Sequence, residues 1–471
     1  MATQETRFKP LHSRMRGVYH LRRCRVTGHA VAAAAQLNYP APISGAPIEM
    51  GRSHLAATLT AALLLAVARS IAAPAEGAAD PKLLEKAKEV HRRIIAFDSH
   101  LDLPFDYPGA STDGKTQFDL PKVERGQLKG AALAVFVPQG PRTPEGYAQA
   151  RADAEKKYNL IRAVAEQNPN LAALAYSSED VHRITSQGKF AVVLSLLNAY
   201  PLGSDLSQID EWYKRGVRIF GYTHAGHNQW ADSSRPSQAL GDTAEEHGGL
   251  SVLGKQGIAR LNEVGMLIDV SQLTTASLKQ VLSLTKAPVA ATHSGLKGLV
   301  DSPRNLTDEE LELIKKNGGV VQVVAFGNYV RPVPKEITDQ VAALQAEYGY
   351  KGNEPPPGLP EAKRAEYADR NRKILSAVPP ATVAQFVDSI DYAVKKIGID
   401  HVGISSDFNH GGGVMGWENE GECQNVTAEL LRRHYSERDV AKLWGGNFLR
   451  VWAEAQGVGK ALKAHHQTRA Q

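Results

Sequence analysis

The 471-residue sequence predicts an α/β fold, a TIM-like (β/α)8 barrel with extra C-terminal helices. Two observations indicate this fold class. Eight short apolar or β-branched runs occur along the chain, and stretches with helical periodicity separate them. Strands that alternate with helices form a parallel sheet, and eight such units close into a barrel. Barrels of this length commonly form one domain, although the chain could also hold two or three average domains.

The expected strands are short runs rich in Val, Ile, Leu and Ala, bounded by Gly, Pro or polar residues. They span residues 93–103, 131–140, 190–200, 217–224, 265–272, 288–295, 319–326 and 401–408. The clearest helical patterns between them, two of which end at a glycine, span residues 277–286, 308–318 and 383–398.

Two segments fall outside this repeating pattern. Residues 330–382, approximately, contain the Pro-rich stretch GNEPPPGLP and a charged helix, which we expect to form a lid or an outer decoration. After the eighth strand the sequence predicts two more helices, and Ser436 with Asp439 gives the second one a start like a capping box. The barrel domain is therefore expected over residues 76–471, with an insertion at about 330–382.

Basic residues are concentrated at the start of the chain. Residues 1–75 carry nine of the 55 Lys and Arg residues but only two of the 50 Asp and Glu residues. An apolar run over residues 55–68 follows Arg52 and precedes an Ala-Pro-Ala stretch, as in a secretory signal peptide. A retained membrane anchor is the less favoured alternative, because a span needs about 20 apolar residues. We therefore predict a leader over residues 1–75, with translation starting at Met50, and export to the periplasm or the membrane surface.

The rest of the chain is slightly acidic, since the basic excess is confined to this leader. No nucleic-acid partner is expected from such a charge distribution. Cys24 and Cys423 are the only cysteines, and the first lies in the leader. The sequence therefore predicts no disulfide framework, and stability has to come from a large core.

Polar residues stand at the carboxyl ends of the expected strands, where barrels of this type place their catalytic groups. They are His100 and Asp102 on the first strand, His224 on the fourth, Gln272 on the fifth, His293 on the sixth and Asp407 on the eighth. His100 and Asp102 are two residues apart, so a regular strand would point both toward one metal ion. Each residue alone could be a core histidine or a capping acid. Four nitrogen and oxygen ligands at one barrel mouth favour a metal hydrolase of the zinc type.

Seven sequence blocks, in order from about residue 90 to 455, resemble those of the membrane dipeptidase family, also called renal dipeptidase or peptidase family M19. They read FDSHLDLP, THAGHNQWADSSRP, GMLIDVSQ, APVAATHSG, DSPRNLTDEEL, IDHVGISSDF and AELLRRHYSERDVAKLWGGNFLRV. The resemblance implies a TIM-like barrel with two zinc ions that share a bridging glutamate and a water. It implies that His100, Asp102 and Asp407 bind the first metal. His293 would bind the second.

The resemblance also implies catalytic and substrate-binding residues. His224 matches the histidine that contacts the substrate and the tetrahedral intermediate, and it would act together with the metal ligand Asp407. Arg304 matches the arginine that holds the substrate carboxylate. Without the resemblance, a surface salt bridge would be an equally good interpretation of Arg304.

The sequence departs from the family at two ligand positions. Leu197, in LLNAYP, occupies the place of the bridging glutamate, and Gln272, in DVSQ, occupies that of a histidine ligand of the second metal. Asn198 is not expected to replace the lost acid, because neighbouring strand residues face opposite sides. An amide oxygen is also a poorer zinc ligand than an imidazole. We therefore expect one zinc ion, with none or two as the alternatives.

Two functions remain open at this point. The first is an exported metallodipeptidase that hydrolyses dipeptides at a degenerate metal site. The alternative is a one-metal or metal-free relative that acts on, or merely binds, a peptide-like small molecule, because the pattern also resembles a periplasmic branch of the family associated with maturation of the siderophore pyoverdine. The expected partner is a small peptide or peptide-like substrate. A homodimer is expected from the family resemblance alone.

Overall fold

The structure is a computed structural model that describes residues 80–351, 355–356 and 358–470. The predicted leader over residues 1–75 lies outside the described residues, as does Cys24, so the signal peptide and the start at Met50 stay predictions. Within the part of the chain that is described, no helix is both long and apolar enough to cross a bilayer.

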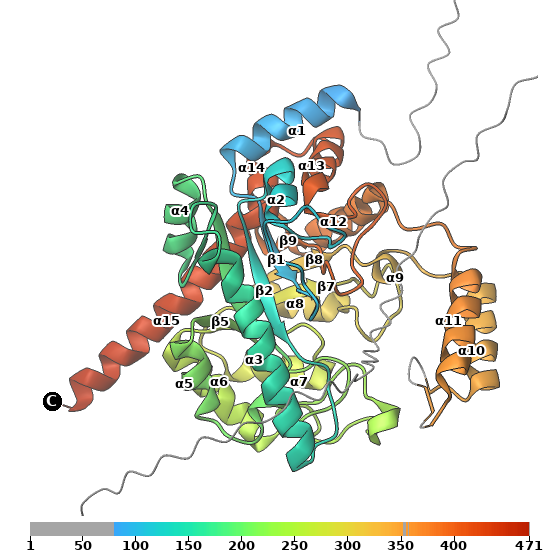
Figure 1. Cartoon of the computed structure of the whole chain (residues 1–471). Helices are drawn as coiled ribbons and strands as arrows, with labels where there is room; N and C mark the ends of the chain where they lie inside the picture. The colour runs from blue at the N-terminus through green and yellow to red at the C-terminus, as the bar shows by residue number, and fades with distance from the viewer. Residues whose placement is uncertain (1–79, 352–354, 357, 471) are drawn as a thin grey trace, which may run out of the picture. The chain divides into compact units, whose positions relative to one another are not determined.

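Parallel strands form the sheet at the centre of the described region, and eight of them follow one another in chain order (Figure 1). These are β1 (Phe97–Leu101), β2 (Gly130–Phe136), β4 (Phe190–Leu197), β5 (Val217–Gly221), β6 (Leu267–Asp269), β7 (Ala290–Ser294), β8 (Val320–Val324) and β9 (Val402–Ser405). The chain segments after β1 and β9 meet through backbone hydrogen bonds, from the Asp407 amide to the His100 carbonyl (3.1 Å) and from the Asp102 amide to the Phe408 carbonyl (3.0 Å). The sheet is thereby nearly closed, and the predicted TIM-like barrel is confirmed.

A ninth strand, β3 (Ala172–Leu174), is not predicted by the periodicity. It pairs with the start of β4 and lies off the path around the barrel. Its sequence, Ala-Ala-Leu, contains no β-branched or aromatic residue, which explains why the sequence gives no signal for it.

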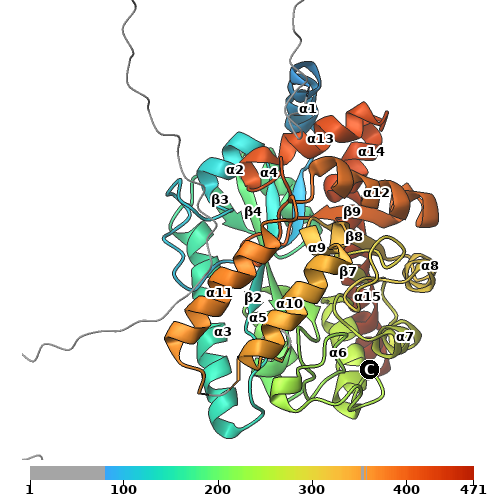
Figure 2. The same ribbon diagram turned by 90° about the vertical axis from the view of Figure 1, so that its right-hand side faces the viewer.

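Helices surround the strands (Figures 1 and 2). They are α1 (Pro81–Arg93), α2 (Leu120–Gly126), α3 (Pro144–Glu166), α4 (Ser178–Ser186), α5 (Gln208–Lys214), α6 (Val252–Val264), α7 (Thr275–Leu284), α8 (Asp308–Lys316), α9 (Gly327–Val330), α10 (Lys335–Tyr348), α11 (Glu361–Leu375), α12 (Val383–Ile397), α13 (Cys423–Arg432), α14 (Glu437–Ala441) and α15 (Asn447–Ala470). The helices α7, α8 and α12 lie close to the bounds that the sequence predicts.

The C-terminal helices form a continuous unit from α14 onward. Ser436 and Asp439 form the expected capping box, in which each side chain accepts a hydrogen bond from the backbone of the other. A π-helical turn (Lys442–Gly446) then joins α14 to α15. Gly445 in this turn lies against the backbone of Ile95, where an added Cβ would be 2.5 Å from the Ile95 carbonyl oxygen. A side chain at this position would therefore push the C-terminal helices away from β1.

The long helix α15 packs against the amino-terminal half of the barrel. Its Phe448 and Trp452 are buried in one apolar cluster with residues from the first halves of the strands, among them Phe97, Ala191 and Leu267. This packing leaves the opposite end, where the strands terminate, as the place for a site.

The predicted insertion over about residues 330–382 contains α10 and α11, which lie side by side in both views (Figures 1 and 2). Leu344, Tyr348 and Tyr367 form a small apolar cluster between the two helices. This cluster is separate from the barrel core, so the helix pair has its own packing. Its expected role as a lid stays a prediction.

Candidate metal and substrate site

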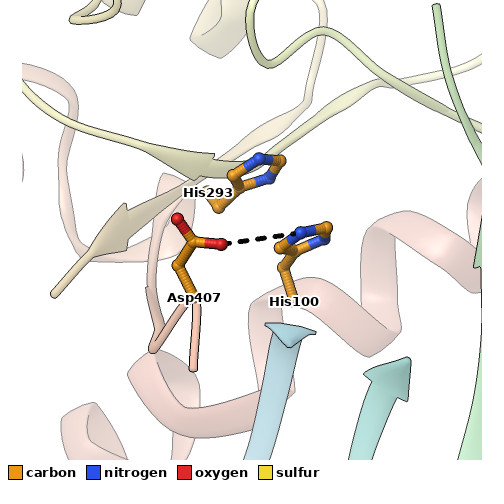
Figure 3. Close-up of side chains that lie close together, drawn as sticks. All are labelled: His100, His293 and Asp407. Carbon is orange, nitrogen blue, oxygen red and sulfur yellow. Dashed lines mark ion pairs between the residues drawn. The ribbon is translucent and has the colours of Figure 1, made fainter. Parts of the chain in front are cut away.

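Three of the predicted metal ligands come together at the carboxyl ends of the strands (Figure 3). His100 belongs to β1, His293 to β7, and Asp407 follows β9. One ligand atom from each lies within 4.8 Å of the others. Among the described residues, these form the only group of three or more His, Cys, Asp or Glu side chains with such spacing. Two imidazoles and a carboxylate are a ligand set that zinc accepts, with a fourth position left open.

The two imidazole rings stack on each other, with ring centres 3.7 Å apart and planes inclined by 8°. His100 Nε2 lies 3.7 Å from Asp407 Oδ1, which is the contact drawn in Figure 3. Neither side chain is exposed to an appreciable extent, and His100 Nε2 has no hydrogen-bond partner. A buried nitrogen without a partner is rare in folded proteins. It fits an atom that binds a cation.

The proton on His293 is fixed by its neighbours. The Thr292 hydroxyl donates to Asp269 Oδ2 (2.6 Å) and lies 2.8 Å from His293 Nδ1. Since the hydroxyl hydrogen is already used, Nδ1 carries the proton and donates to the Thr292 oxygen. The lone pair of His293 is therefore on Nε2, where it accepts from the Gln272 amide nitrogen at 3.1 Å. This is the arrangement by which proteins orient a metal-binding histidine.

Burial governs the protonation of the three ligands. Removal from water, followed by the charge effects of His410 and Arg304, lowers the pKa of His100 well below its ordinary value. Burial likewise lowers the pKa of His293. Burial raises the pKa of Asp407 to about 8, against the opposing effect of Arg304 and Arg235. Both imidazoles are thus neutral and ready to bind a metal at pH 7, whereas Asp407 has to lose a proton first.

Asp102, the fourth predicted ligand, lies outside this group. Its two carboxylate oxygens each accept a hydrogen bond of 2.8 Å from Lys157 Nζ, and Oδ1 also accepts from the Leu103 amide. Asp102 follows Leu101, the last residue of β1, so the strand alternation that would align it with His100 no longer applies. The structure places it at the barrel mouth, but paired with a lysine.

Gln272, at the position of the other predicted histidine ligand, is held by an arginine. Arg235 donates to Gln272 Oε1, and its guanidinium lies 3.4 Å from His224 Nε2 and 3.4 Å from the Tyr329 hydroxyl. Its Nε is buried and unpartnered. A permanent positive charge therefore stands next to Gln272, where the resemblance implies a second metal.

Leu197, the last residue of β4, forms part of an apolar wall of the mouth. It is 2% exposed and packs with Ala134 and Phe136 of β2 in a cluster of three residues. Phe136 continues this wall to His224, with ring centres 4.6 Å apart. Asn198 turns away from the triad, since its amide donates to the Val137 carbonyl and accepts from Asn228. The Leu197 side chain is a hydrocarbon, so this position offers no ligand atom.

Arg304 is a buried residue and not part of a surface salt bridge. Its guanidinium donates to the His293 carbonyl and to the Ser294 hydroxyl (3.3 Å), and the residue is 4% exposed. Burial lowers its pKa to about 10, and the nearby Arg235 adds to this effect. Arg304 and Gln272 both line a cavity of about 290 Å³, and Gln272 connects this cavity to the triad through its hydrogen bond with His293. Such a cavity has room for the end of a small peptide.

The backbone is strained at the strand exits that carry this site. Asn198, Gln272 and Asp407 adopt φ angles of 74°, 69° and 56°, in the left-handed region that favours glycine. Residues in such conformations cost free energy and are concentrated at functional sites. Here the strain sits in the segments after β4, β6 and β9, and the last of these carries the triad residue Asp407.

Three residues of the site are not predicted from the sequence as functional: Lys157, Arg235 and His410. His410 lies three residues after Asp407, and Arg235 lies eleven residues after His224. The His410 ring lies against both Phe136 and His224, with ring centres 4.3 Å and 5.0 Å away. Lys157 carries a different signal, because it occupies the buried stripe of α3 at helical spacing from Ala150, Ala154 and Ile161. A lysine on an apolar stripe indicates a buried ionic partner.

The fold is a parallel α/β barrel, and the triad at its mouth could hold a metal ion. The family model for membrane dipeptidase, peptidase family M19, matches residues 84–466. The chain therefore belongs to this family, and its enzymatic class is that of a hydrolase. The family is generally metal-dependent.

Known proteins of this kind are similar over most of the chain. The structure of the probable dipeptidase PvdM from Pseudomonas aeruginosa is 48% identical, with a TM-score of 0.75, and covers 80% of this chain and 99% of that one. Dipeptidase aclJ of Aspergillus oryzae is 27% identical over 351 residues, which are 74% of this chain and 72% of the relative. A metallopeptidase from Rhodobacter sphaeroides, solved with a phosphinate mimic of L-Ala-D-Ala, shares the fold at 19% identity, with a TM-score of 0.59, over 77% of this chain and 99% of that one.

Proposed function

We propose that this chain is an exported hydrolase that cleaves the peptide bond of dipeptides or similar small molecules with a single divalent metal ion, zinc being the first candidate. The observation that carries the proposal is the buried triad of His100, His293 and Asp407. Among the described residues, His100 Nε2 has no hydrogen-bond partner. The lone pair of His293 lies on Nε2, where a metal ion would replace the Gln272 amide as its partner. Burial raises the pKa of Asp407 to about 8, so a bound cation would stabilise its carboxylate form. These residues fit one ion.

A second ion does not fit the residues present. Leu197 offers no ligand atom, and Gln272 is bound by Arg235 on one side and by His293 on the other. A neighbouring guanidinium also repels a cation. We therefore derive the chemistry from one metal and from the side chains around it.

A metal ion held by the triad would polarise the substrate carbonyl and lower the pKa of a bound water. The remaining roles belong to protein groups. Arg304, beside the cavity, would bind the substrate carboxylate and so orient the peptide bond. His224 is neutral, because burial lowers its pKa, and with Arg235 it would face the negative charge that develops on the carbonyl oxygen.

Metal content and turnover of the purified full-length protein test this proposal. We expect about one zinc ion per chain after dialysis, and hydrolysis of some members of a panel of L,L and L,D dipeptides. The His100→Ala variant should lose both the bound zinc and the dipeptide hydrolysis. His182→Ala, a change of an exposed histidine on α4, should lose neither. Two tightly held ions per chain would contradict the single-metal site, and bound zinc without any dipeptide turnover would contradict the dipeptidase activity.

A second candidate function is a metal-free relative that binds a peptide-like molecule. The observation that favours it is the pair of side-chain cations, Lys157 on Asp102 and Arg235 on Gln272, which supply positive charge without a metal. Peptide binding that survives treatment with a chelator would support this candidate over the first.

Export and dimerisation have separate tests. N-terminal sequencing of the exported protein should give a mature terminus near residue 75, and a terminus upstream of residue 70 would contradict the predicted signal peptide. Light scattering of the purified protein would establish whether a homodimer forms.

A further inference from the structure

Lys157 is a buried cation in the wall of the barrel. It lies on α3, is 2% exposed, and its ammonium group contacts both oxygens of Asp102 and the Leu103 carbonyl. The ring of Phe105 covers it, with the ring centre 4.6 Å from Nζ. The three donors of the ammonium group thus all face this one pocket.

The Asp102 carboxylate already accepts three hydrogen bonds, two of them from one cation, and keeps a free lone pair only on Oδ2. Oδ1 accepts from Lys157 and from the Leu103 amide, and Oδ2 accepts from Lys157 with His410 Nδ1 at 4.0 Å. A metal ion that took the place of Lys157 would leave the ammonium group as a buried charge without a partner. Such an exchange is costly, because an uncompensated buried charge is strongly destabilising.

We propose that Lys157 is a positioning residue that binds Asp102 and keeps its carboxylate out of the metal shell, so that the site binds its ion through His100, His293 and Asp407 alone. This inference rests on the proposed single-metal function. It explains why an acid two residues from His100 does not join the triad. It also predicts that the protein contains a fourth ligand that can be released by one substitution.

The alternative is that Lys157 and Asp102 form an ordinary structural ion pair with no bearing on the metal. Both interpretations expect a loss of stability when Lys157 is replaced. They differ in metal affinity, because only a carboxylate within reach of the ion can strengthen metal binding after its release. Metal titration therefore separates them where activity and melting temperature do not.

The experiment is a double-mutant cycle on the full-length protein with Lys157→Met and Asp102→Asn. Each protein is titrated with Zn²⁺ by calorimetry and with Co²⁺ by visible absorption, which reports the ligand set. We expect Lys157→Met to bind zinc about 10- to 100-fold more tightly, the size of effect that neighbouring groups have on metal sites. Asp102→Asn alone should leave the affinity within about twofold, and the double variant should return to the parent value.

Lys156→Met is the matched control. Lys156 is the exposed neighbour on the same helix, and its ammonium group lies 5.2 Å from the same Phe105 ring. This variant should bind zinc like the parent, which shows that a gain at Lys157 is not a general effect of removing a positive charge.

Unchanged zinc affinity and cobalt spectrum in folded Lys157→Met would overturn the inference. If that variant does not fold, Asp102→Asn decides, because a loss of affinity of about tenfold or more would show that Asp102 already binds the metal. The outcomes also separate the two proposals. Zinc binding by Lys157→Met but not by the parent would refute the proposed single-metal function and support the inference, whereas parental binding without a gain would refute the inference alone.

Discussion

Metal binding to the triad should release a proton, and the amount follows from the environment of Asp407. Burial raises the pKa of this carboxyl to about 8, while the pKa values of His100 and His293 are lowered. At pH 7 the carboxyl group is then about 90% protonated, so each bound ion should displace about 0.9 proton. The histidines should contribute none, because they are already neutral.

The same argument fixes the pH dependence of the affinity. Zinc binding should weaken about tenfold for each pH unit below 8 and should level off above about pH 9. Calorimetric titrations at pH 6, 7 and 9, in buffers with different ionisation enthalpies, measure both the affinity and the number of protons released. The reasoning would be refuted if zinc binding released almost no protons at pH 7 and if the zinc affinity were the same at pH 6 and pH 9.

Asp407→Asn provides the control through stability in the absence of metal. A group whose pKa is raised on folding contributes stability that is present below its ordinary pKa and is lost as the pH rises through the folded value. The metal-free parent should therefore lose melting temperature between pH 7 and 9. Asp407→Asn should lose less over this interval, since asparagine does not ionise. Zinc should also stabilise the parent more than the variant.

Three further changes test other parts of the structure. Leu197→Glu with Gln272→His, in an Arg235→Ala background that removes the competing charge, should raise bound zinc from one ion per chain to two, measured by elemental analysis. Binding of a single ion by this triple variant would contradict our account of the second position. Replacing the carboxylate of a dipeptide substrate by an amide should raise KM about 10- to 100-fold in the parent but much less in Arg304→Lys. An equal effect in both proteins would argue against Arg304 as the carboxylate-binding residue. Ser436→Ala, which removes the cap of α14, should destabilise the protein by about 1 kcal/mol in urea unfolding without altering zinc binding.

Much of the fold was predictable because it depends on local patterns. The eight barrel strands appear as apolar runs, and the capping box at Ser436 appears as two residues at fixed spacing. The strand β3 was missed, since its Ala-Ala-Leu sequence lacks the β-branched and aromatic residues that favour strands. Its place is decided by pairing with β4, which is distant from it in the sequence.

The sequence by itself determined which residues stand at the strand exits, because strand ends can be located from local patterns. His100, His293 and Asp407 were found in this way, whereas the lost ligands at Leu197 and Gln272 came from the resemblance to the family. The partner of each polar group could not be found in the same way. That partner depends on which side chains the closed barrel brings together.

Only the tertiary structure decided how the charges are paired. The sequence predicts that Asp102 is a metal ligand. In the structure Asp102 instead pairs with Lys157 of α3, which lies 55 residues further along the chain. The sequence predicts that Gln272 is a poor metal ligand. In the structure its side-chain oxygen accepts a hydrogen bond from Arg235, which lies in the loop after β5. Burying a carboxylate or an amide costs free energy unless a hydrogen-bond donor compensates for the lost water. Which donor is near enough to do so depends on how distant segments of the chain pack together.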